Sequence, residues 1–253
     1  MRTSRRALLG TAAAGALALG FGAGAPARAE GRSVRVAVLL YDGFTALDAV
    51  GPYETLCRLP GVRVVTVAPR AGAVRTDTGQ LALTAERSLA DVHAADVLVV
   101  PGGGNRGMVA ALDDTVLLEW IRRIHRNTTW TTSVCTGSLL LASAGLLKGL
   151  PATTYWAARP YLQKLGAVPA PGRFVETGRI ITAAGVSAGL DMGLHLAARL
   201  CDEATAKAMQ LAIEYDPQPP FDCGSPQKAD EATRQLALKL VEGGAARAAG
   251  PMR

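Results

Sequence analysis

Residues Thr131 to Gly145 read T-T-S-V-C-T-G-S-L-L-L-A-S-A-G, and this stretch changes character at Cys135. The residues before the cysteine are mostly β-branched and are typical of a strand. From Ser138 onward, leucine and alanine dominate in a way that is typical of a buried helix. We therefore expect Cys135 to stand at a sharp turn between a strand and a helix.

A cysteine at such a turn lies beside the unpaired N–H groups of the first helical turn. Because this positive helix end favours the thiolate, we expect a depressed pKa for Cys135 and a nucleophilic sulfur. Gly137 leaves room for the backbone to pass close to a bound ligand. The alternative is a buried structural cysteine, since free cysteines are among the most buried residues.

Around this turn, apolar runs of strand length alternate with helical patterns. Strands are expected at Val34–Leu40, Val62–Ala68, Val97–Val100 and Arg179–Ala183, with a turn and short strand pair at Thr76–Leu83. Helices are expected at Ala46–Arg58 (broken near Gly51-Pro52), at Asp113–His125 (capped by Asp113 or Asp114), at Ala188–Leu200 and at Glu203–Ile213. This alternation predicts an α/β fold, an open and mostly parallel sheet with helices on both faces. Ligands of such sheets bind beyond the carboxyl ends of the strands.

The first residues predict an export signal. Arg5-Arg6 is a twin-arginine pair before a weakly hydrophobic run, and Ala27-Arg28-Ala29 is the small-x-small pattern that signal peptidase cleaves. Glycine and alanine dominate the run, which disfavours an uncleaved membrane anchor. We expect residues 1–29 to direct twin-arginine export to the periplasm or the medium, with no stable membrane association after cleavage.

Cleavage would remove most of the positive charge. The signal holds four arginines and no acidic residue, so the formal net charge falls from +6 to +2. This balance disfavours a nucleic-acid-binding surface. We expect one α/β domain at residues 30–226 and a C-terminal helix with a frayed tail at residues 227–253.

The cysteines and histidines indicate neither a disulfide scaffold nor a metal site. The four cysteines are Cys57, Cys135, Cys201 and Cys223. Their wide spacing permits disulfides in an exported protein but lacks the density of a disulfide framework. Cys57 and Cys201 lie in apolar helical stretches and suit the core. The three histidines are scattered, so we expect no metal, and no organic cofactor is implied.

Three loops at predicted carboxyl ends of strands carry reactive or anion-binding groups. One holds Asp42 and Asp48, one holds Gly102–Gly104, and the third holds Cys135 and Thr136. The glycine N–H groups can face a developing negative charge, although a glycine run is also typical of a tight turn. A thiol, an acid and N–H groups at one sheet edge are the parts of a covalent-catalysis site.

Asp48 is the candidate proton donor. Its neighbours are mostly apolar, so its pKa is expected to be raised toward neutrality. The spacing fits equally well a helix N-cap or a first-turn acid with a structural role. Asp42 fits a Tyr-Asp-Gly turn and is expected to be structural.

These residues resemble the ThiJ/PfpI superfamily, with its flavodoxin-like, class I glutamine amidotransferase-like fold. The resemblance covers essentially Val34 to Pro226. It rests on S-V-C-T-G at the cysteine, Leu47-Asp48, the Pro101–Gly104 turn and the proline-rich segment Glu214–Pro226. Within the superfamily the sequence looks most similar to the isonitrile hydratases. The resemblance implies a homodimer in which Cys135 is the nucleophile, Asp48 the proton-transfer acid and Thr136 its hydroxyl-bearing partner.

Two positions depart from patterns of the superfamily. The protease and deglycase branches place His directly after the cysteine, where this chain has Thr136, which argues against peptide or deglycation chemistry. The usual A-T-T-H-W reads A-T-T-Y-W here. Tyr155 can donate a hydrogen bond to a substrate but cannot act as a base near neutral pH.

The implied activity is the hydration of a small isonitrile. The Cys135 thiolate attacks the terminal carbon while Asp48 protonates it, and water releases an N-substituted formamide from the thioimidate. The N–H groups of Gly103, Gly104 and Thr136 are expected to stabilise charge.

The alternative is an exported, non-catalytic small-molecule-binding protein. The strand-to-helix turn at Cys135, called the elbow below, also resembles part of the sensor domain of AraC-type regulators. Those regulators continue into a helix-turn-helix domain, for which the stretch after Pro226 is too short.

Overall fold

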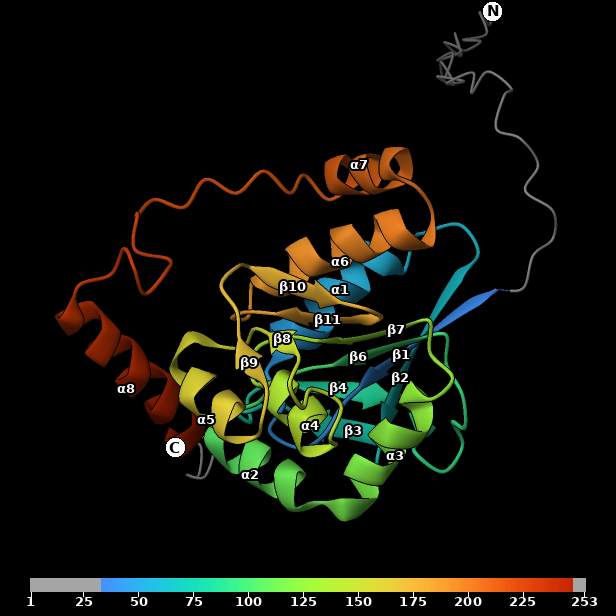
Figure 1. The fold of residues 1–253 in the computed structure, drawn as a ribbon, viewed down its shortest axis with the longest axis horizontal. Coiled ribbons are helices and arrows are strands. Elements are labelled where there is room, and N and C mark those ends of the chain that lie inside the picture. Colours follow the sequence, from blue (N-terminus) through green and yellow to red (C-terminus); the bar gives the residue numbers. More distant parts are fainter. Residues whose placement is uncertain (1–32, 248–253) are drawn as a thin grey trace, which may run out of the picture. The chain divides into compact units, whose positions relative to one another are not determined.

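The structure is a computed structural model that describes residues 33–247, with side chains described through Gly244. The export signal expected at residues 1–29 and the last residues of the expected tail lie outside the described residues. The described part of the chain is built around one central sheet (Figure 1).

The sheet has seven strands in the order β10-β11-β7-β6-β1-β2-β5. The strands are β1 (Val34–Leu39), β2 (Val62–Ala68), β5 (Arg87–Ser88), β6 (Val97–Val100), β7 (Trp130–Ser133), β10 (Phe174–Thr177) and β11 (Ile180–Ala183). All neighbouring pairs run parallel except β10 and β11. Every residue of β6 is buried because helices cover both faces of the sheet. The expected open, mostly parallel α/β sheet is confirmed.

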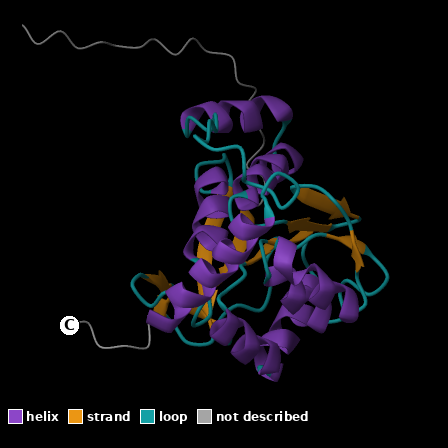
Figure 2. Ribbon diagram, turned by 90° about the vertical axis from the view of Figure 1, so that its left-hand side faces the viewer, coloured by secondary structure: helices purple, strands orange, loops and turns teal. Residues whose placement is uncertain are grey.

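Two groups of helices cover the sheet. On one face lie α1 (Ala46–Leu56) and α6 (Ala188–Leu200), and α7 (Glu203–Ala212) packs outside α6 in both ribbon views (Figures 1 and 2). On the other lie α2 (Asn105–Asp113), α3 (Thr115–His125), α4 (Gly137–Ser143) and α5 (Arg159–Lys164). The smaller elements are the hairpin β3 (Gly72–Arg75) with β4 (Ala82–Ala85), the parallel pair β8 (Pro151–Ala152) with β9 (Val168–Pro169), the 3-10 turn η1 (Trp156–Ala158) and α8 (Glu231–Arg247). Among residues 33–247, no helix is both long and apolar enough to cross a lipid bilayer.

The predicted break in the first helix is wrong, because α1 runs through Gly51 and Pro52 without interruption. Proline removes one backbone donor, but tight packing against α6 compensates for it. A Cβ atom added to Gly189 of α6 would lie 3.3 Å from Pro52 Cδ. The glycines of both helices therefore let the two backbones approach closely, and α1 stays continuous through Pro52.

The elements that were not predicted are the helices α2 and α5, the turn η1 and the strands β5, β8, β9 and β10. The α2 helix follows the triple glycine directly and is short, and no element was assigned to its stretch from the sequence. The antiparallel strand β10 lies at the sheet edge and is only half-buried, which leaves no apolar run in the sequence. The α3 helix begins at Thr115, and the Asp114 side chain caps it by accepting a hydrogen bond from Leu117 N at 3.0 Å.

Candidate active site

Cys135 occupies the predicted turn between β7 and α4. Its φ of 56° lies in the left-handed region that non-glycine residues seldom adopt. The strained backbone is held from β11, because Cys135 N donates to Ala184 O at 2.8 Å and to Ala183 O at 3.2 Å. Cys135 is buried, with 6% of the residue exposed, so the thiol does not lie on the surface. The expected nucleophile elbow is therefore present.

Asp48 lies in the first turn of α1 and is completely buried. Its Oδ2 accepts a hydrogen bond from Gly102 N at 2.9 Å, whereas Oδ1 has no hydrogen-bond partner among the described residues. Burial raises the pKa of this carboxyl to about 7, with a further contribution from the negative charge of Asp77. The predicted raised pKa is thus supported, and Asp48 can exchange a proton near neutral pH.

The prediction of a depressed pKa for Cys135 is wrong. Burial raises the pKa of the thiol well above its ordinary value, and the Asp48 carboxylate raises it further. Hydrogen bonds from the backbone N–H groups of Thr136 and Val186 lower the pKa but do not outweigh burial. The reasoning from the helix end failed because α4 is only seven residues long and its first turn is shielded from water.

The acid and the thiol titrate as a pair in one dry site. The Asp48 carboxylate is among the causes that raise the pKa of Cys135, so the pair resists carrying two negative charges. Above pH 7 it therefore keeps one proton, which the sulfur holds because the pKa of Cys135 is the higher of the two.

The expected role of Gly103 and Gly104 as free donors needs correction. Gly103 N donates to Thr136 Oγ1 at 3.0 Å, and Gly104 N donates to Gly43 O at 3.0 Å. Both N–H groups are thus already used within the protein. The glycines instead permit close packing, since a Cβ atom on Gly103 would lie 2.6 Å from Gly43 O.

The donors that face the sulfur come from Thr136 and Val186. Val186 was not singled out from the sequence, although it follows β11 at the same carboxyl edge of the sheet as Cys135. The Thr136 side chain also donates to Gly103 O at 3.3 Å, so it braces the glycine turn. Thr136 therefore contributes both an N–H group beside the thiol and a structural hydroxyl.

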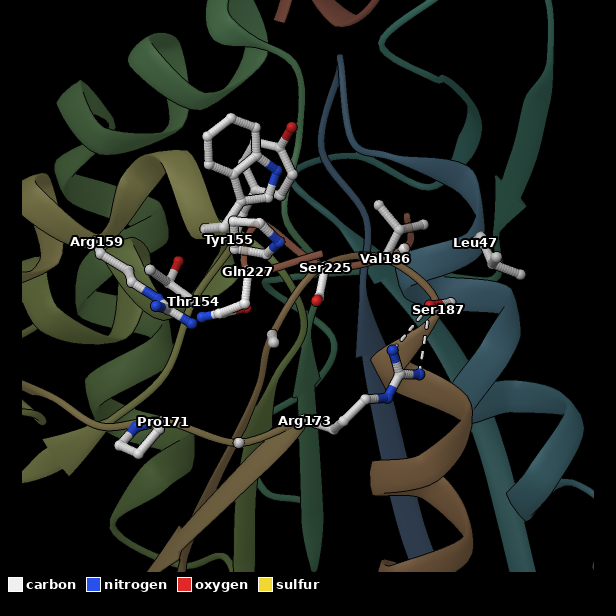
Figure 3. Close-up of a pocket in the computed structure, with 16 residues that line it drawn as sticks. Leu47, Thr154, Tyr155, Arg159, Pro171, Arg173, Val186, Ser187, Ser225 and Gln227 are labelled. Atoms are coloured by element: carbon white, nitrogen blue, oxygen red, sulfur yellow. Dashed lines mark hydrogen bonds between the residues drawn. The ribbon is translucent and has the colours of Figure 1, made fainter. Parts of the chain in front are cut away.

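A cavity of about 620 Å³ opens beside the elbow (Figure 3). Thr154, Tyr155 and Arg159 line one side in this view, and Leu47, Val186 and Ser187 line the other. The backbone of the first side is tied to the elbow, because Thr154 Oγ1 donates to Cys135 O at 3.0 Å.

Tyr155 is placed where it can meet a ligand near the thiol. The tyrosine ring is half-buried and lies 5.5 Å from the ring of Trp156. Burial, together with the charge of Cys135, raises the pKa of Tyr155, so its hydroxyl stays protonated and can donate. Asp42 lies apart from the cavity lining, in the turn after β1, where its Oδ1 accepts from Arg75 N at 3.3 Å.

The other cysteines do not join the site. The four described cysteines are thiols rather than disulfides; Cys57 is half-buried, Cys201 is half-buried and packs against the core, and Cys223 is exposed. Within residues 33–247, no cluster of three His, Cys, Asp or Glu side chains could hold a metal ion.

Known proteins match this chain over most of its length. The model of the DJ-1/PfpI family matches residues 34–199. Isonitrile hydratase from Pseudomonas putida is 40% identical over 213 residues, which cover 82% of this chain and 92% of that enzyme. The HTH-type transcriptional regulator CdhR from Pseudomonas aeruginosa is 29% identical over 189 residues, but the match covers only 53% of the regulator. Among solved structures, a THiJ/PfpI family protein from Pseudomonas syringae is 37% identical with a TM-score of 0.78, covering 87% of this chain and 92% of that one.

Proposed function

Because this chain belongs to the DJ-1/PfpI family, we propose that it is a cysteine-dependent hydratase that converts a small isonitrile to an N-substituted formamide. The chain is a homologue of isonitrile hydratase over most of both sequences, which supports this reaction. The observation that carries the proposal is the buried pair of Asp48 and Cys135, with one acid of near-neutral pKa beside one thiol.

The first step needs one proton and one sulfur nucleophile. The terminal carbon of an isonitrile becomes a good electrophile only as it accepts a proton. In the singly protonated pair, the Asp48 carboxylate takes the proton from the Cys135 thiol and passes it to the isonitrile carbon as the sulfur bonds to that carbon. The product is a thioimidate, and Asp48 is left as a carboxylate.

The second step restores the pair. Asp48 takes one proton from water as the oxygen bonds to the thioimidate carbon, and the other water proton passes to the substrate nitrogen. The carbon–sulfur bond then breaks, which releases the formamide and returns Cys135 as a thiolate. The N–H groups of Thr136 and Val186 stabilise negative charge on the departing sulfur.

A ligand-sensing role is the weaker alternative. It is supported by the similarity to the transcriptional regulator CdhR. That similarity is lower in sequence identity than the similarity to isonitrile hydratase, and it covers about half of the regulator. A sensor needs a pocket but has no need for a buried acid of near-neutral pKa beside the thiol. The Asp48–Cys135 pair therefore favours catalysis.

Turnover tests the proposal. The protein should convert members of a panel of alkyl and aryl isonitriles to the matching formamides, measured by proton NMR. Cys135→Ala should abolish conversion, and Cys223→Ala, which changes an exposed cysteine remote from the elbow in the chain, should retain it. Absence of any hydration by the folded wild-type protein would lead us to abandon the proposed function in favour of the ligand-binding role.

A further inference from the structure

The cavity beside the elbow carries cationic side chains without acidic ones. Arg159 and Arg173 line it, and no Asp or Glu does. Arg173 is already neutralised, because its Nε forms an ion pair with Asp191 and its two Nη atoms donate to Ser187 Oγ at 3.3 Å (Figure 3). The uncompensated charge of the cavity therefore belongs to Arg159.

Arg159 has no ion pair and no hydrogen bond with any described residue, and its Nε is buried from water without a partner. Arg159 as a whole is half-buried, but a buried polar nitrogen such as its Nε normally has an acceptor. Figure 3 shows the Arg159 side chain reaching toward Gln227, inside the cavity. The missing acceptor is one that a ligand can supply.

A short stretch of chain leads from the elbow at Cys135 to Arg159. Thr154 is hydrogen-bonded to the elbow, Tyr155 lies near the Cys135 charge, and the short turn η1 leads from there to Arg159. A ligand whose reactive carbon meets Cys135 can therefore extend along Tyr155 to the guanidinium. The planar fork of arginine matches a carboxylate, which it binds through two parallel hydrogen bonds.

We propose that Arg159 binds a carboxylate on the substrate, so that the enzyme acts on isonitriles that carry an acid group. This inference rests on the proposed hydration for the identity of the reacting group. The carboxylate site itself rests on the unpaired guanidinium and the acid-free cavity.

Kinetics with matched substrates test the preference. Isocyanopropanoate, isocyanobutanoate and isocyanopentanoate are each compared with their methyl esters, which keep the shape and remove the charge. The best acid should exceed its ester in kcat/KM by about tenfold or more, as expected for a charged hydrogen-bonding pair. Arg159→Gln should bring the acid-to-ester ratio to about one, mainly through KM, and Arg159→Lys should keep part of it.

The matched control is Arg58→Gln, which removes an exposed arginine that pairs with Glu54 at the end of α1, outside the cavity. It should keep the full acid-to-ester ratio. An equal ratio in the wild-type enzyme, or a preference that survives in Arg159→Gln, would overturn the inference.

Binding without turnover separates this inference from the proposed function. Formamidobutanoate and its methyl ester are titrated into wild-type protein and Arg159→Gln by calorimetry. The wild type should bind the acid at least about tenfold more tightly than the ester, and the variant should lose this difference. If no isonitrile is hydrated, the proposed function fails while calorimetry still decides the carboxylate site; equal binding of acid and ester by the wild type rejects it.

Discussion

The carboxyl of Asp48 and the thiol of Cys135 both have raised pKa values, and burial is the largest cause for each. The two groups differ in what their ionisation does. A carboxylate at Asp48 raises the pKa of the sulfur, so removing that charge should make Cys135 more easily ionised. Removing Asp48 also removes the proton donor. Catalysis and thiol reactivity should therefore respond in opposite directions.

Asp48→Asn should lower isonitrile turnover by about 10²–10⁴, the usual contribution of a general acid. The same variant should speed alkylation of Cys135 by iodoacetamide near pH 8, because its thiolate fraction rises. Peptide mapping after timed alkylation and formamide release measured by NMR give the two readouts. Asp42→Asn, in the exposed turn, should change neither. Slower alkylation of Cys135 in Asp48→Asn would contradict the assigned coupling.

The pair also predicts how activity depends on pH. Below the Asp48 pKa of about 7 the pair holds two protons and the sulfur is a neutral thiol. As pH rises through 7 the Asp48 carboxyl loses its proton while the Cys135 thiol keeps its own, so the carboxylate can draw the thiol proton and pass it to the substrate. We expect kcat/KM to rise through about pH 7, and this limb should be absent in Asp48→Asn. A profile that falls through pH 7 would mean that the doubly protonated pair is the active form.

Among the elements, α1 and α6 make the closest contact that positions the acid. A Cβ atom on Gly193 would lie 2.0 Å from Thr55 Oγ1, a side chain that donates to Pro52 O at 2.9 Å inside α1. An added methyl group must therefore push the two helices apart or displace this threonine.

Gly193→Ala should destabilise the fold by about 1–3 kcal/mol, the usual cost of overpacking a well-filled interior. Urea unfolding followed by circular dichroism measures this change. Gly243→Ala in α8 is the control, because a Cβ atom there meets nothing within 4 Å. Combining Gly193→Ala with Thr55→Ala should recover part of the loss, since the colliding hydroxyl is gone. If the two variants lower the free energy of unfolding additively, the collision with the Thr55 hydroxyl is not the cause of the destabilisation.

Elements with long apolar patterns could be read from the sequence. The α6 helix and β2 have the predicted bounds, because each carries one consistent apolar pattern along its length. Helix α1 was misread because proline and glycine weaken a helix locally, whereas here the partner helix decides the outcome.

The candidate site was predictable only in part, for a similar reason. Asp48 and Cys135 could be identified as candidate site residues from their residue types and from the residues beside them in the sequence. The direction in which a backbone N–H group points cannot be predicted from the sequence. Gly103 and Gly104 were therefore assigned as donors in place of Val186. Nothing in the sequence around Arg159 distinguishes it from other arginines. Its place in the cavity lining and its unpartnered Nε are seen only in the structure.

At the scale of the whole molecule, the site is assembled from loops that follow β1, β6, β7 and β11. Segments that are distant in the sequence therefore have to be in place together before the acid meets the thiol. Twin-arginine export carries proteins that are already folded, which suits a site of this kind. We propose that the chain is exported in this way and that residues 1–29 are removed.

Mass spectrometry of protein recovered from outside the cytoplasm should show a chain that begins at Glu30, after Ala27-Arg28-Ala29. Replacing Arg5-Arg6 with Lys-Lys should keep the protein in the cytoplasm with its leader attached. A product that begins near Met1 in the wild-type strain would refute the proposed export.

Outside the cytoplasm a reactive cysteine meets peroxide and other oxidants, which attack the thiolate rather than the thiol. In the resting site Cys135 is buried and the pKa of its thiol is raised, so it offers oxidants little thiolate and little access. Burial therefore keeps the sulfur of Cys135 as a thiol, which is a weak nucleophile and resists oxidation to sulfenic acid. The thiol loses its proton only when a substrate is bound to accept it. If the chain is exported as proposed, the burial of the thiol slows the oxidation of Cys135 outside the cytoplasm.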